Sequence, residues 1–204
     1  GEYGFGDRFL GVVVPDIRFV ARKYFHLIGE REISRLVASS YHEERLLGFL
    51  IQVLRFKNAS VRQREALYRW YTRRISRVNN WDLVDLTAPH IVGAYVYGKS
   101  TKPLYLWARS KNIWKRRIAI VATLYCIRQG QYRDTCAIAT ILLNDTHDLI
   151  HKACGWMLRE VGKKDVAVLE RYLQTNASLM PRTMLRYAIE RFPEHKRRHY
   201  LRMS

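Results

Sequence analysis

Apolar residues recur at steps of three and four along most of the chain, which places them on one face of an α-helix. The first such run begins at Pro15 and includes Ile17, Val20, Tyr24 and Leu27. The same pattern predicts further helices over about residues 31–39, 41–57, 60–77, 81–97, 103–109, 112–129, 133–143, 147–161, 165–174 and 181–192. Extended segments are nearly absent, so the sequence predicts an all-α protein.

Short breaks separate these segments and carry the Asn, Ser and Gly residues that cap helices and form turns. They lie at 57–60, 79–80, 98, 130, 144–145 and 162. Helix pairs of this size recur at about 40 residues, the length of a HEAT-type repeat. We therefore expect one domain over residues 1–204, a HEAT-like solenoid of antiparallel helix pairs with a basic concave face; a globular bundle is the alternative. Residues 1–14 are expected to form an extended lead-in, flexible over residues 1–7.

Positive charge changes this picture. Lys and Arg number 36 against 18 Asp and Glu, which gives a net charge of +18 and favours an extended polyanion as partner. Anionic lipid and an idle solvated surface are the alternatives. Arg69, Arg73 and Arg77 are spaced i, i+4 and i+8, with Arg62 near the same face, so they predict a helical stripe that contacts a nucleic-acid backbone. Binding would depend on salt and carry little sequence preference. Further basic clusters lie at 115–117, 163–164, 182–186 and 196–198.

Three features bear on the cellular setting. The longest uncharged stretch, residues 86–98, is interrupted by Pro89 and is too short to span a bilayer. Cys126, Cys136 and Cys154 lack the C-x-x-C pairing of zinc and redox sites. We therefore expect reduced core thiols and a cytoplasmic protein, without membrane attachment, zinc or disulfides.

Residues 93–100 match the phosphate-loop pattern G-x-x-x-x-G-K-S, which would indicate an NTPase. A phosphate loop follows a buried strand, whereas a helical segment containing Pro89 precedes this one. We therefore expect Gly98 to end a helix and Lys99 to begin a loop, and no nucleotide cofactor is predicted.

Two histidine pairs have the one-turn spacing that can hold a metal ion, His147 with His151 and His195 with His199. The carboxylate of an H-E-x-x-H site is missing and no third ligand is evident. Capping or solvated histidines are therefore expected, and no metal.

Trp81 and Asp85 lie at i and i+4 directly after Asn79 and Asn80, so both side chains project from one helix face. An indole ring can pack on a sugar, and a carboxylate can stabilise the oxocarbenium charge that develops as a glycosidic bond breaks. The alternative is an acidic residue favoured by the helix dipole beside a core tryptophan.

Four segments, in order along nearly the whole chain, resemble the AlkD family of DNA alkylation-repair glycosylases. They are YHEERLL at 41–47, NWDLVD at 80–85, NIWKRR at 112–117 and ACGWMLRE at 153–160. The resemblance implies an enzyme that cradles duplex DNA and removes cationic alkylated purines such as N3-methyladenine and N7-methylguanine. It also implies that the base stays in the stack, that no cofactor is used and that the enzyme acts as a monomer.

The resemblance also assigns residues to roles. Asp85 corresponds to the catalytic carboxylate, and Trp81 and Trp156 correspond to the aromatic residues that flank the sugar of the lesion. The residues assigned to phosphate binding are Arg117, Arg116 and Lys115.

Two departures bear on this assignment. Asn80 stands where certain relatives have another aromatic residue, and the chain starts close to the first shared helix. A non-catalytic HEAT-like DNA-binding or scaffold protein is therefore the alternative to a glycosylase.

Overall fold

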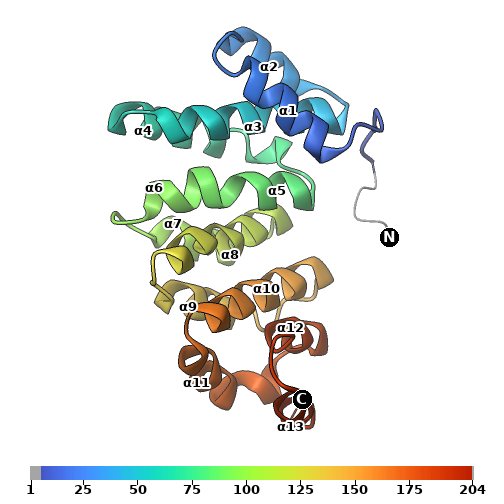
Figure 1. Cartoon of the computed structure of the whole chain (residues 1–204), viewed down its shortest axis with the longest axis vertical. Coiled ribbons are helices and arrows are strands. Elements are labelled where there is room, and N and C mark those ends of the chain that lie inside the picture. Colours follow the sequence, from blue (N-terminus) through green and yellow to red (C-terminus); the bar gives the residue numbers. More distant parts are fainter. Residues whose placement is uncertain (1–5, 204) are drawn as a thin grey trace. The chain divides into compact units, whose positions relative to one another are not determined.

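The computed structural model describes residues 6–203 and is helical almost throughout (Figure 1). Within this range the only extended pairing is an isolated bridge between Arg8 and Tyr41, so the all-α prediction is confirmed. No helix in the described part is long and apolar enough to cross a membrane. Residues 1–5 of the expected lead-in lie outside the described residues.

The chain divides into two compact units, Gly1–Tyr95 and Val96–Ser204. In a helical repeat each element contacts mainly its neighbours, so such an array divides readily into compact parts. The single HEAT-like domain over residues 1–204 therefore stays a prediction, and the two units are described separately.

The first unit is built around α3 (His42–Asn58), which packs against α1 (Val14–Tyr24), α2 (Glu30–Ala38) and the later helices of the unit. The α3 residues Leu46, Phe49 and Ile51 are buried and form the centre of the core. The other elements of this unit are α4 (Val61–Thr72), η1 (Ile75–Arg77), α5 (Trp81–Ala88) and η2 (Pro89–Gly93). The short α6 (Ala94–Val96) follows.

The central helix of the second unit is α10 (Asp148–Lys164). It packs closely on α12 (Arg182–Ala188), and Gly155 permits this close approach. A Cβ atom at this position would lie 2.5 Å from the Met184 carbonyl oxygen and 2.5 Å from the Tyr187 Cβ. The other helices are α7 (Lys102–Ala108), α8 (Ile113–Arg128), α9 (Arg133–Ile141), α11 (Val166–Asn176), η3 (Ala177–Leu179) and α13 (Glu194–Leu201).

The three cysteines of the second unit carry free thiols, as predicted. Cys126 and Cys154 are buried and Cys136 is partly buried. Burial, with a smaller contribution from the charge of Asp134, raises the pKa of Cys126 to about 11. Burial also raises the pKa of Cys154 and of Cys136.

Three predicted helix boundaries are wrong. The segment 60–77 is not one helix, because α4 ends at Thr72 and a separate 3₁₀ turn follows. The segment 81–97 contains a π-helical stretch that begins at Pro89, whose ring nitrogen has no N–H to donate. The segment 181–192 ends at Ala188, and α13 was missed because its sequence EHKRRHYL has no apolar stripe.

The phosphate-loop match at 93–100 lies in a helical setting. Its first residues belong to η2 and α6. The preceding element is the helix α5, whereas a phosphate loop follows a strand. Gly98 adopts a φ of 72° just after α6, so it ends the helix as expected. The local fold therefore excludes a phosphate loop at this position.

Candidate functional site

Trp81 and Asp85 lie one turn apart on α5, as the sequence predicted. Asn80 caps this helix, since its side-chain oxygen accepts the Trp81 amide N–H at 2.7 Å. The Trp81 side chain is 45% exposed, while Asp85 is half-buried. An indole open to solvent therefore stands at the start of the helix, with a carboxylate one turn further on.

Asp7 connects the start of α5 to the start of α3. Its Oδ1 accepts hydrogen bonds from Arg45 at 2.5 Å and from Asn79 at 3.1 Å, and its Oδ2 accepts one from Asn80 at 3.1 Å. Burial alone would raise the pKa of Asp7, but the bonds from Asn80 and Arg45 and the charge of Arg45 outweigh it and lower the pKa. The carboxylate is therefore held in its ionised form.

His42 lies between two carboxylates. Its Nδ1 is 3.1 Å from Asp7 Oδ2, and its Nε2 is 2.7 Å from Asp82 Oδ2. Burial alone would lower the pKa of His42, but the hydrogen bonds and charges of Asp82 and Asp7 outweigh it and raise the pKa. A protonated ring donates to both acids and thereby joins the first turn of α3 to the first turn of α5.

The segment before α1 is anchored on α3. The Glu43 carboxylate accepts the amide N–H groups of Leu10 and Gly11, both at 2.9 Å. Burial alone would raise the pKa of Glu43, but these backbone N–H groups outweigh it and lower the pKa. The expected flexibility of the lead-in is wrong at Asp7, because Arg45, His42 and the asparagines hold its carboxylate.

Asp85 is backed by the core of the first unit. Tyr71, which is fully buried, lies near it, and its hydroxyl is 3.0 Å from Thr87 Oγ1. The pKa of Tyr71 is raised mainly by burial and further by the charge of Asp85. The charge of Asp85 therefore acts on a buried phenol of the core, where electrostatic effects are strong.

The predicted phosphate-binding residues lie at the start of α8 in the second unit. Asn112 caps the helix by accepting the amide N–H of Lys115 at 3.1 Å. Arg116 Nε donates to Asp145 Oδ2 at 2.5 Å, and its NH1 donates to two backbone carbonyl groups. Arg117 is only 4% exposed, and its NH1 donates to the Leu149 carbonyl oxygen at 2.5 Å. Arg116 and Arg117 thus bind groups of the protein itself, whereas the Lys115 ammonium group makes no hydrogen bond or ion pair within the described residues.

Trp156 lies on α10 and is half-buried. Its indole Nε1 donates to Glu160 Oε1 at 3.2 Å, and the same carboxylate oxygen accepts from Lys163 at 2.7 Å. The structure therefore brings Trp81 and Asp85 together on α5, while Trp156 and Arg117 belong to the second unit.

Comparison with known proteins identifies the family of this chain and a protein of similar fold. The family model described as DNA alkylation repair enzyme matches residues 3–192. The chain belongs to the DNA alkylation repair enzyme family. In fold, it is similar to a predicted DNA alkylation repair enzyme from Enterococcus faecalis, with 16% sequence identity, a TM-score of 0.72, and coverage of 93% of this chain and 90% of that one. No curated protein sequence matches significantly.

Membership in the DNA alkylation repair family supports a role in DNA repair, but several predicted DNA contacts serve the fold. The stripe predicted from Arg69 to Arg77 is broken, because α4 ends at Thr72 with Arg73 as its cap, and Arg77 lies in the separate 3₁₀ turn η1. Arg77 instead donates to the carbonyl oxygens of Val37, at 3.0 Å, and Ser39, at 2.8 Å, at the end of α2. Arg69 pairs with Glu65 on its own helix.

The basic clusters near the C-terminus are engaged in the same way. Lys196 pairs with Glu170 and Arg198 with Glu194, while Arg182 donates to a carbonyl oxygen of α13. Among the histidines, His147 caps α10 by accepting the Leu149 amide N–H at 3.2 Å, as expected for a capping residue. No group of side chains within residues 6–203 has the composition of a metal site.

Sequence reasoning missed Asp7 and His42. His42 falls within the segment 41–47 that resembles the AlkD family, but no role was assigned to it. The two acids that bind His42 lie 35 and 40 residues away along the chain. No local pattern in the sequence therefore marks this histidine.

Proposed function

We propose that this protein is a monofunctional DNA glycosylase that hydrolyses the N-glycosidic bond of cationic alkylated purines in duplex DNA. Substrates would include N3-methyladenine and N7-methylguanine, and the base would stay in the stack. The observation that carries the proposal is the pair formed by the exposed Trp81 and the half-buried Asp85 on α5. It occurs in a DNA alkylation repair family member with a net charge of +18.

The chemistry follows from the charge of the lesion. When the bond between C1′ and N9 of the purine breaks, its electron pair goes to the base, which leaves as a neutral alkylated purine and needs no strong acid. Positive charge develops on the sugar, and Asp85 stabilises it electrostatically. Water then adds to C1′ and releases a proton, which leaves an abasic sugar. The Trp81 ring excludes solvent and adds cation–π attraction.

The residues of the second unit are assigned supporting roles. Trp156 supplies a second aromatic wall, and the start of α8 faces the phosphates of the damaged strand. Of the three cations there, Lys115 is best placed for direct contact, because Arg116 is bound to Asp145 and Arg117 is buried. The enzyme is proposed to act as a monomer.

The test is the substitution Asp85→Asn. Single-turnover release of N7-methylguanine from a methylated duplex is expected to fall by at least about 100-fold, because the transition-state charge loses its counter-charge. Binding to undamaged duplex should stay within about twofold. Asp16→Asn, which removes an exposed carboxylate from α1 in the same unit, is the control and should leave release unchanged.

Equal release by Asp85→Asn and wild type would overturn the mechanism. If the wild-type protein binds methylated duplex and releases no base, the non-catalytic DNA-binding alternative holds instead.

A further inference from the structure

A small pocket in the first unit is lined by basic residues from three helical elements. It has a volume of about 290 Å³ and lies between α1, α3 and the α5–η2 segment. Its basic residues are Arg18, Arg22, Lys57 and His90, and its lining contains no Asp or Glu. The remaining lining is apolar and consists of Ala21, Leu50, Val53, Leu54 and Leu86.

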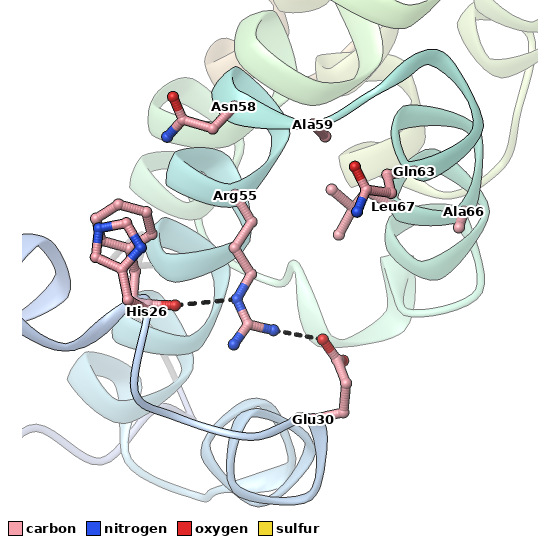
Figure 2. A pocket seen from close by; sticks show the side chains of 9 residues that line it. His26, Glu30, Arg55, Asn58, Ala59, Gln63, Ala66 and Leu67 are labelled. Atoms are coloured by element: carbon pink, nitrogen blue, oxygen red, sulfur yellow. Dashed lines mark hydrogen bonds and ion pairs between the residues drawn. The ribbon is translucent and has the colours of Figure 1, made fainter.

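A second pocket of the same unit shows what a pocket cation normally does. There, Arg55 pairs with Glu30 at 2.5 Å and donates to the Phe25 carbonyl oxygen at 3.2 Å (Figure 2). That pocket is larger, about 460 Å³, and its charge is balanced internally. Arg55 thus links α3 to α2, and its charge is already paired with that of Glu30.

The cations of the small pocket differ from Arg55. Within the described residues, the side chains of Arg18, Arg22 and Lys57 make no hydrogen bond or ion pair, and all three are exposed. Arg18 and Arg22 are one turn apart on α1, and Lys57 lies in the last turn of α3. Like charges gathered around one concave site repel each other and raise the local concentration of anions.

We infer that this pocket binds the sugar–phosphate backbone of a DNA strand beside the site proposed above. Arg18, Arg22 and Lys57 would neutralise phosphate, and the sugar would pack on the apolar floor formed by residues such as Leu50 and Leu86. The choice of DNA as the ligand rests on the proposed function. Leu86, which lines the pocket, and Asp85 are neighbours in α5, so the pocket and the proposed catalytic carboxylate share one helix.

The test compares two triple variants of equal charge. The pocket variant is Arg18→Gln/Arg22→Gln/Lys57→Gln. The control is Lys23→Gln/Arg31→Gln/Arg35→Gln, which removes three exposed first-unit cations that lie outside the pocket. Binding of a labelled undamaged duplex is measured by fluorescence anisotropy at several salt concentrations. The pocket variant should bind about tenfold or more weakly, and its plot of log Kd against log salt should be shallower by about one to three. The control should change both quantities much less.

A third variant guards against loss of folding. Arg18→Lys/Arg22→Lys/Lys57→Arg keeps the charge and should retain most of the salt dependence of wild type. Equal loss of duplex affinity in the pocket and control variants would overturn the inference. It would also be overturned if the pocket variant lost binding only to inorganic phosphate or to vesicles containing an anionic lipid.

This experiment is separate from the test of catalysis, because undamaged duplex requires no base release. Unchanged duplex binding by the pocket variant would overturn the inference and leave the glycosylase proposal standing. Conversely, release by Asp85→Asn at the wild-type rate would overturn the proposed mechanism without affecting this binding result.

Discussion

The basic residues around the small pocket of the first unit differ from those of the second unit that pair with acids. In the first unit Arg18, Arg22 and Lys57 are exposed around one pocket and bind no described acid. In the second unit many cations are engaged, as with Arg116 on Asp145 and Lys196 on Glu170. The same basic composition thus builds a surface for an anion in one place and stabilises the fold in another. What distinguishes the two is the presence of an acid or a free carbonyl group within reach.

The largest expected effect concerns how tightly each unit packs. Gly155→Ala should destabilise the second unit by about 3 kcal/mol, because the new Cβ would meet a backbone oxygen and a Cβ that cannot move independently of α12. Gly48→Ala in the first unit should cost only about 1 kcal/mol, since its nearest neighbour is a Val37 methyl group at 2.7 Å. Urea unfolding gives both values. Amide hydrogen exchange should become faster in α10 and α12 of Gly155→Ala. A uniform increase along the whole chain would contradict a local effect at the contact between α10 and α12.

The next prediction separates structural from available arginines. Arg117→Met should lower the free energy of unfolding by about 2 kcal/mol, because the buried Leu149 carbonyl loses its donor. Arg18→Met, which removes an exposed guanidinium without a described partner, should change it by less than about 0.5 kcal/mol. Thermal unfolding at matched pH measures both. A negligible cost for Arg117→Met would show that this arginine is not needed by the fold.

The acid–histidine–acid contact of the first unit makes its stability depend on pH. The pKa of His42 is raised above 6.5 in the folded protein, so its contribution is complete below pH 6.5 and is lost as pH rises through the folded-state pKa. His42→Gln should therefore cost about 1.5 kcal/mol at pH 6 and progressively less at higher pH. Parallel unfolding curves between pH 5.5 and 9 test this. His195→Gln on α13, an exposed imidazole, is the control, and a constant gap between wild type and His42→Gln would contradict the charged contact with Asp7 and Asp82.

The smallest expected effect is at Trp81. Because its ring is 45% exposed, Trp81→Ala should leave the free energy of unfolding within about 0.5 kcal/mol. Release of N7-methylguanine should nevertheless slow by about five- to tenfold through loss of cation–π attraction. Single-turnover rates of Trp81→Ala and Trp81→Phe would check this. A substantial loss of stability with unchanged release would assign the ring to the fold instead.

Local features of the protein could be predicted from its sequence. Apolar spacing located most helices, and the predicted break at residues 79–80 lies directly before α5. The turn at Gly98 followed from glycine's tolerance of positive φ. These features depend on residues a few positions apart, so periodicity and capping preferences were sufficient.

Features that depend on distant partners could not be predicted in this way. Asp7 is 73 residues from Asn80, and Arg77 is 40 residues from the carbonyl group it reaches at Val37. Charge spacing treats every arginine as exposed, so it assigned Arg77 to DNA without considering the carbonyl groups beside it. The assignment of Arg117 to phosphate came from the family resemblance and stays a prediction. The Trp81–Asp85 pair was predictable because both residues lie on one helix turn, whereas the network behind it was not.

The buried cysteines have a consequence for a member of the DNA alkylation repair family, because the electrophiles that alkylate DNA also attack sulfur. Such agents attack thiolates far faster than thiols. The pKa of Cys126, raised to about 11, keeps almost all of that side chain protonated at neutral pH, and the burial of Cys154 acts in the same direction. These two thiols are thereby protected from the class of chemicals that alkylate DNA.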